Sequence, residues 1–205
     1  MTGRVEKVEK VVLATNNPRK LIELRRVIRD AGLAVDVLGL GDFDPCPEPA
    51  ETERTFEGNA FIKAEAAARH TGLAALADDS GLEVDELNSM PGVRSARWAG
   101  PECDDAANNA LLLAQLAGVP AERRGARFVC ALALVLPGGG RQLWRGEMSG
   151  RIAEEERGDG GFGYDPLFLP EGWTCTSAEL TAAQKDAISH RGKAVRAFVA
   201  WLKEQ

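Results

Sequence analysis

The sequence is poor in the residues that build disulfide frameworks and zinc sites. Its four cysteines stand far apart, at positions 46, 103, 130 and 175, and no two of them form a Cys-x-x-Cys pair. This spacing argues against both kinds of site and is typical of a protein kept in a reducing compartment. Histidine is also scarce, because only His70 and His190 occur in 205 residues.

Long apolar runs and an excess of positive charge are missing as well. No stretch is long enough to span a bilayer, and the N-terminus, MTGRVEKVEK, has no apolar signal core. The net charge of −6 disfavours a polyanion such as DNA as a partner for the whole surface. We therefore expect a cytoplasmic protein that binds neither a membrane nor a nucleic-acid polymer, although a small anion can still bind where Lys and Arg gather.

Two well-known catalytic motifs are absent. The chain contains no G-x-x-x-x-G-K-[ST] phosphate-binding loop, and Ser80 is not part of a G-x-S-x-G nucleophile elbow. These absences exclude a P-loop enzyme and make a serine hydrolase a poor interpretation. At 44% hydrophobic and 27% charged, the composition is that of an ordinary globular protein with enough apolar residues for a core.

Helix and strand patterns alternate early in the chain, and strands pair late. This order predicts an α/β fold with a mixed sheet flanked by helices, in one domain over residues 1–205. Residues 36–49, rich in Pro, Gly and Asp, predict an irregular connection. The expected strands cover Val11–Ala14, Leu73–Ala77, Phe128–Leu136 and Arg141–Ile152, with a glycine turn at residues 138–140 between the last two. One helix is expected from Pro18, one from about Phe56 with Thr55 as its cap, one capped by Asp104 or Asp105, a short one with a capping box at 181–184, and a last one with His190 and Arg191 at its start and Val195, Phe198, Val199 and Leu202 on one face.

The stretch AALADDSGLEV, residues 74–84, ends an apolar run on two adjacent aspartates. Adjacent strand residues point to opposite faces, so Asp78 and Asp79 are not expected to share one role. One interpretation is a turn, since Asp, Ser and Gly all favour chain reversal. The other is a carboxylate at the end of a strand, where α/β sheets bind ligands and where Mg²⁺ or a water can be held. The residues alone leave both open.

Two segments could hold a nucleotide. In VVLATNNPRKL, Asn17 suits a helix N-cap and Lys20 adds a positive charge near a helix start, which attracts anions, although an ordinary capped helix explains the segment equally simply. In GDGGFGYDP, glycines let a flat ligand approach the backbone, and Phe162 or Tyr164 could stack on a purine. Aromatic residues that plug the core are the alternative there.

The order and spacing of these segments resemble those of the inosine triphosphate pyrophosphatase family. A single segment would be a weak signal, but several in the same order along nearly the whole chain are a strong one. The matching segments are LATNNPRK (13–20), TFEGNAFIKA (55–64), ADDSGLEVD (77–85), PGVRSARW (91–98), GDGGFGYDP (158–166) and AELTAAQKDAISHRGKA (178–194).

The resemblance implies an enzyme that hydrolyses ITP, dITP and XTP to the monophosphate and pyrophosphate with Mg²⁺. It implies an elongated α/β fold of two lobes with the active cleft between them, and a homodimer. Asp79 would be the proton acceptor and a metal ligand, and Ser80 would contact substrate. The remaining substrate-binding positions would be Thr15, Asn16, Asn17, Pro18, Arg19 and Lys20 for the triphosphate, and Phe162, Gly163, Tyr164, Asp165, Lys185, His190 and Arg191 for the nucleoside.

The sequence departs from the family pattern near the second metal carboxylate. Gly58 precedes the Asn of the NA motif where the family often has an acidic residue, and the family's Glu-Thr-Gly stretch reads Glu51-Thr52-Glu53. Glu51 is our candidate for that ligand, with Glu48 as the alternative. Two rival functions remain: a Maf-type pyrophosphatase acting on pyrimidine or modified nucleotides, and a non-catalytic nucleotide-binding module.

Overall fold

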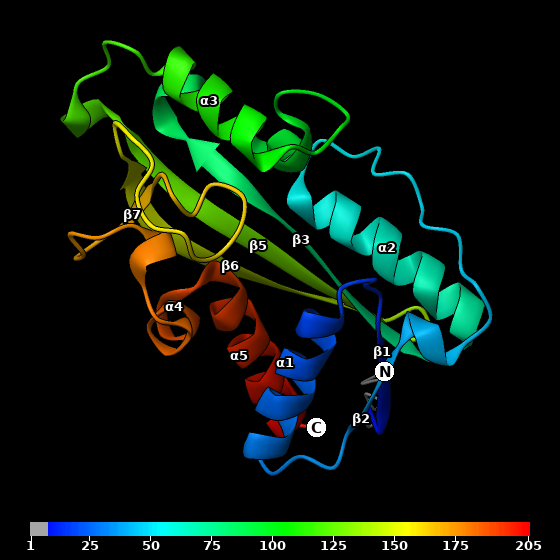
Figure 1. Cartoon of the computed structure of the whole chain (residues 1–205). Helices are drawn as coiled ribbons and strands as arrows, with labels where there is room; N and C mark the ends of the chain where they lie inside the picture. The colour runs from blue at the N-terminus through cyan, green and yellow to red at the C-terminus, as the bar shows by residue number, and fades with distance from the viewer. Residues whose placement is uncertain (1–7) are drawn as a thin grey trace. The chain divides into compact units, whose positions relative to one another are not determined.

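The computed structural model describes residues 8–205, in which seven strands form one mixed sheet. The order is β2-β1-β3-β5-β6-β7, and β4 pairs with β3 beside this path. Helices flank the sheet, so the predicted α/β class is confirmed (Figure 1). The strands are β1 (Lys10–Leu13), β2 (Asp36–Gly39), β3 (Ala74–Val84), β4 (Met90–Pro91), β5 (Gly125–Val135), β6 (Arg141–Ile152) and β7 (Phe168–Pro170).

The α-helices follow local signals that the sequence shows plainly. They are α1 (Pro18–Asp30), α2 (Phe56–Thr71), α3 (Asp105–Gln115), α4 (Ala182–Ile188) and α5 (His190–Lys203). Asn17 caps α1 by accepting a hydrogen bond from the Arg19 N–H at 2.9 Å, and Thr55 caps α2 in the same way through the Gly58 N–H at 3.1 Å. None of the helices in residues 8–205 is long and apolar enough to cross a membrane.

The chain forms two compact units. The first takes in the described residues up to Asp79 together with 131–145 and 193–205, and the second takes in 80–130 and 146–192. Strand β3 passes from the first unit to the second between Asp79 and Ser80. The expected active cleft between two lobes and the expected single domain stay predictions.

The first unit contains three parallel strands, with β1 between β2 and β3. The chain steps from β1 to β2 on one side and then crosses back to β3 on the other. Because such crossovers are right-handed, the two steps place α1 and α2 on opposite faces of the strands, as Figure 1 shows. The core of this unit includes Val11, Val12, Leu24 and Phe198, none of which is more than 2% exposed.

The second unit has its own apolar cluster. It joins Leu82 and Val84 of β3, Leu112 and Leu116 at the end of α3, Phe128 of β5 and Phe168 of β7. Asp104 caps α3 by accepting hydrogen bonds from the Ala106 and Ala107 N–H groups. Helix α3 is therefore held at both ends, by its cap and by the apolar cluster.

One of the two interpretations left open for the ADDSG stretch is wrong, and one expectation is wrong in part. Ser80 and Gly81 do not form a turn, because β3 continues through them to Val84 and pairs there with β4, so the backbone has ladder partners that outweigh local turn preference. Residues 36–49 are not wholly irregular, because residues 36–39 form β2, which pairs with β1 from Lys10↔Asp36 to Leu13↔Gly39. The four residues of β2, which end in glycine, are too few to show the hydrophobic pattern that predicts a strand.

Candidate active site

The two adjacent aspartates of β3 bind two different lysines. Asp78 accepts a hydrogen bond from the ammonium of Lys20 on α1 at 2.7 Å, and its side chain is 2% exposed. Asp79 accepts one from Lys63 on α2 at 2.9 Å. Because α1 and α2 cover opposite faces, strand alternation sends each aspartate to its own lysine. The expectation that Asp78 and Asp79 face different ways is confirmed, but Asp78 holds Lys20 rather than a turn.

A second carboxylate joins the face that carries Asp79. Lys63 donates to Glu51 at 3.1 Å as well as to Asp79, and Asn59 donates to Asp79 at 3.4 Å. Asn59 and Lys63 stand four residues apart on α2, so they share one face of that helix. The result is a half-buried group in which two carboxylates converge on one ammonium.

Burial and charge shift the pKa values of this group. Burial raises the pKa of Asp79; the nearby ammonium of Lys63 opposes that rise and the charge of Glu51 adds to it, so the pKa lies above its usual value. Burial lowers the pKa of Lys63, but its hydrogen bonds and attraction to Asp79 and Glu51 outweigh that effect and raise it. Lys63 is thus held as a cation, while the charge on Asp79 is less favourable than in water.

The start of α1 lies near the same carboxylate group. Thr15 and Asn16 line a small cavity with Glu48 and Lys63. The hydroxyl of Thr15 accepts from the Asn17 N–H at 3.1 Å, Pro18 opens the helix, and Arg19 is exposed. The segment from Thr15 to Lys20 therefore presents a helix start and two cations on the first unit, as the sequence predicted.

The second unit holds a cavity of about 160 Å³ lined by much of the predicted nucleoside site. Phe162 is 76% exposed, and the Lys185 ammonium lies 4.9 Å from the centroid of its ring. Asp165, 3% exposed, accepts hydrogen bonds from the Phe162 N–H and from the Lys185 ammonium. The predicted residues that line this cavity are Ser80, Phe162, Gly163, Tyr164, Asp165, Lys185 and His190.

The two aromatic residues of the glycine-rich segment have different surroundings. Tyr164 is only 4% exposed, belongs to the apolar cluster, and donates its hydroxyl to the Ser95 carbonyl at 2.8 Å. Burial raises the pKa of the Tyr164 hydroxyl, so it stays protonated. Phe162 is therefore the ring available for stacking, and Tyr164 supports the wall.

Helix α5 brings His190 to the same cavity. Its ring stacks on Phe128 with centroids 5.1 Å apart and an angle of 15° between the planes. Arg191, the next residue, is half-buried, and it is not among the described residues that line this cavity. The structure thus brings His190, Lys185 and Phe162 together around one cavity. Arg191 directly follows His190 in the sequence.

The chain is similar to known proteins over most of its length. The profile of the Ham1 family matches residues 11–201. A dITP/XTP pyrophosphatase of Nocardia farcinica is 60% identical over 188 residues, covering 91% of each chain. The chain belongs to the Ham1 family.

Solved structures of Ham1 relatives share the fold. The nucleoside-triphosphatase/dITP/XTP pyrophosphatase of Mycobacterium abscessus is 53% identical with a TM-score of 0.82, covering 94% of this chain and 99% of its own. A HAM1 protein from Coxiella burnetii is 41% identical with a TM-score of 0.90, covering 96% and 99%. The α/β architecture is therefore that of the Ham1 family.

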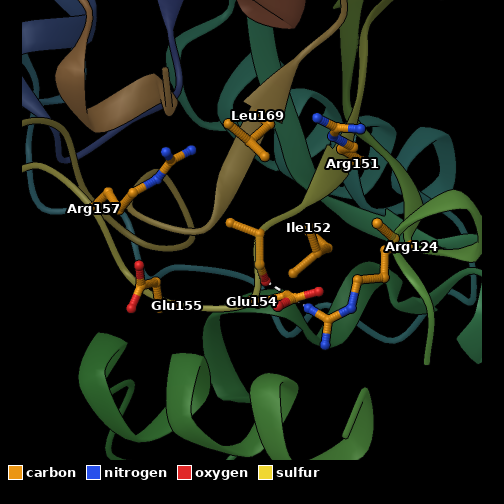
Figure 2. A pocket seen from close by; sticks show the side chains of 9 residues that line it. Arg124, Arg151, Ile152, Glu154, Glu155, Arg157 and Leu169 are labelled. Carbon is orange, nitrogen blue, oxygen red and sulfur yellow. Dashed lines mark hydrogen bonds between the residues drawn. The ribbon is translucent and has the colours of Figure 1, made fainter. Parts of the chain in front are cut away.

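Another cavity of the second unit, about 530 Å³, is lined by arginines and glutamates (Figure 2). Arg124, 5% exposed, donates to the carbonyls of Val119, Ala153 and Leu116 at 3.1, 2.6 and 2.8 Å. It therefore braces the chain that follows α3. Glu154 is exposed. Among the described residues that line this cavity, no two carboxylates bind one ammonium as Asp79 and Glu51 do in the first unit. We therefore do not assign catalysis to this cavity.

Three residues near these sites carried no role in our reading of the sequence. Lys63 and Asn59 lie in the matched segment TFEGNAFIKA, and their spacing of four residues is the signal that could have singled them out. Asp105 lines the cavity of the second unit, but from the sequence it was only one of two candidate helix caps. Only the fold brings these side chains to the other site residues.

Proposed function

We propose that this member of the Ham1 family hydrolyses the triphosphates of deaminated purines, namely ITP, dITP and XTP, to the monophosphate and pyrophosphate. Such an activity removes deaminated purines from the nucleotide pool. The observation that carries the proposal is the group in which Asp79 and Glu51 converge on Lys63. The name of the Nocardia farcinica relative supports the choice of substrate.

The donor set fits a hard divalent cation such as Mg²⁺. Carboxylate oxygens are its preferred protein ligands, and Asp79 and Glu51 present two of them around one point, with Glu48 as the alternative to Glu51. Mg²⁺ typically binds through one or two protein carboxylates plus substrate phosphates, a number that Asp79 and Glu51 could supply. When bound, Mg²⁺ would supply positive charge to the phosphate oxygens.

Asp79 is assigned the role of proton acceptor for the attacking water. A carboxylate with an ordinary pKa is a weak base at neutral pH, and burial raises the pKa of Asp79, which makes it a stronger base than a carboxylate in water. Lys63 holds this carboxylate in place at 2.9 Å. Lys20 and the helix start from Thr15 would bind the triphosphate, whose charge needs cations more than covalent chemistry.

The nucleoside is assigned to the cavity of the second unit. Phe162 would stack on the base, and Lys185, His190 and Arg191 would donate hydrogen bonds to it. Hypoxanthine and xanthine present an O6 acceptor and an N1–H donor, whereas adenine presents the reverse pattern. A donor aimed at O6 would be left without a partner by ATP, which buried sites penalise strongly. Arg191, which can only donate, would disfavour the 2-amino group of GTP.

A pyrophosphate-release assay with Mg²⁺ tests the proposal against its rivals. We expect ITP, dITP and XTP to be cleaved well, with ATP, GTP, dTTP and UTP cleaved at least about 100-fold less efficiently. That factor is a lower bound, because a site that hydrogen-bonds its substrate can reject a mismatch by about 10⁴-fold or more. Preference for dTTP or UTP would instead indicate a Maf-type enzyme. Binding of ITP without pyrophosphate release would indicate a nucleotide-binding module.

We also propose a homodimer in the cytoplasm. The dimer follows from the resemblance to the inosine triphosphate pyrophosphatase family and is tested by sedimentation. The cytoplasm suits the four cysteines, all of which are free thiols.

A further inference from the structure

The segment that carries Phe162 is rich in glycine, and within it Asp165 accepts a hydrogen bond from the Phe162 N–H at 2.9 Å. Phe162 lies between Gly161 and Gly163, whose φ angles of +77° and +60° are in the left-handed region. Glycine loses more conformational freedom on folding than any other residue, so such a segment is not rigid by itself. The ring is 76% exposed, and little packing of its own can fix it.

Helix α3 grips the peptide groups next to Phe162. The carboxylate of Asp105 accepts a hydrogen bond from the Gly163 N–H at 2.7 Å, and the amide of Asn109 donates to the Gly163 carbonyl at 3.2 Å. Asp105 and Asn109 stand four residues apart on α3 and therefore share one face. Both hydrogen-bonding groups of Gly163 are thus held by one helix.

The side chain of Asn109 does not stabilise the fold as well as an apolar side chain at that position would. It is 3% exposed, and its side-chain oxygen accepts no hydrogen bond from any described residue. A buried polar atom without a partner destabilises the fold, and an apolar side chain of similar shape would avoid that cost. Residues that break a stability rule tend to mark functional positions.

The neighbouring Asn108 also hydrogen-bonds to backbone groups of a segment that lines the cavity. Its amide donates to the Ala96 carbonyl at 3.1 Å, and its oxygen accepts from the Ala99 N–H at 2.6 Å. Ala96 lines the same cavity as Phe162 and Asp105. One turn of α3 therefore holds two segments that form this cavity.

We propose that Asp105 and Asn109 are positioning residues for the base, which hold Gly163 so that the Phe162 ring stays placed for stacking. The inference rests on the proposed function, because it assumes that the base binds in this cavity. The brace acts on binding of the nucleoside, while Lys20 and the helix start from Thr15 are assigned to the triphosphate. Its loss therefore raises KM and weakens binding of the product IMP, with kcat close to that of the wild type.

Three variants at two adjacent aspartates test the brace. Asp105→Ala removes the acceptor for Gly163, Asp105→Asn keeps an acceptor oxygen, and Asp104→Ala removes the α3 cap but leaves the Gly163 bonds. We expect Asp105→Ala to raise KM for ITP and Kd for IMP about three- to tenfold, the factor for one net hydrogen bond. Asp105→Asn should stay near wild type. Asp104→Ala should lower the melting temperature without changing KM.

Hydrogen exchange of residues 158–166 gives a readout that needs no substrate. Faster exchange of the Gly163 amide in Asp105→Ala, with the wild-type rate restored in Asp105→Asn, supports the brace. This result holds even if the wild type does not cleave ITP, because failure to cleave ITP would refute only the proposed function. Unchanged exchange or unchanged KM in Asp105→Ala overturns the brace. So does a rise in KM that Asp105→Asn or Asp104→Ala shares.

Discussion

Replacing Asp78 and Asp79 one at a time by asparagine separates stability from activity on a single strand. The side chain of Asp78 is 2% exposed and that of its partner Lys20 is 28% exposed. Removing one member of a fully buried ion pair costs about 3–5 kcal/mol. Lys20 keeps a path to water and asparagine still accepts a hydrogen bond, so we expect Asp78→Asn to cost about 1–3 kcal/mol.

Asp79→Asn should behave in the opposite way. Burial and the charge of Glu51 raise the pKa of Asp79, so the fold does not favour its ionised form. Lys63 keeps Glu51 as a partner at 3.1 Å after the change. The free energy of unfolding should therefore change by less than about 1 kcal/mol, while loss of the proton acceptor should lower kcat about 10²- to 10⁴-fold.

Thermal unfolding and pyrophosphate release from ITP, measured on the same samples, distinguish the two variants. For a chain of this length, 1 kcal/mol shifts the melting temperature by about 2–4 °C, so Asp78→Asn should melt about 2–12 °C lower. Its kcat, measured well below that melting temperature, should stay near wild type. Equal losses of activity in two folded variants, or an Asp79→Asn enzyme as active as wild type, would refute the reasoning.

Two further changes test individual contacts. Phe162→Ala should raise KM for ITP about 5- to 150-fold through lost stacking, and it should leave the melting temperature unchanged because the ring is 76% exposed; Phe162→Trp should restore binding, and a lower melting temperature would contradict the assignment. Glu179→Gln tests a hydrogen bond, since Glu179 accepts the Thr176 N–H at 2.6 Å, and this bond lowers the pKa of Glu179 below its usual 4.5. A lowered pKa stabilises the fold above the unfolded-state pKa, so the wild type should melt higher than the variant above pH 4.5, and the difference should shrink as the pH falls below that value. If the difference in melting temperature between wild type and variant grew as the pH fell, it would not come from the hydrogen bond to the ionised Glu179.

Much of the candidate site could be predicted because its chemistry follows ordered segments of the chain. Asn17 and Thr55 were recognisable as helix caps, and Asp104 as one of two candidates for a third, since a cap acts on N–H groups two or three residues away. The glycine turn and the strand Arg141–Ile152 were recognisable for the same reason. Strand β2 and the passage of β3 through Ser80 were not, because pairing with other strands of the sheet decided both.

The sequence by itself determined that Asp78 and Asp79 face opposite ways, because strand geometry alternates with every residue. Tertiary structure decided which lysine each one meets. Lys20 stands 58 residues from Asp78 and Lys63 stands 16 from Asp79, and only the placement of α1 and α2 on opposite faces joins the pairs. Packing likewise decided that Tyr164 supports the core while Phe162 stays exposed, because two aromatic rings two residues apart differ only in what surrounds them.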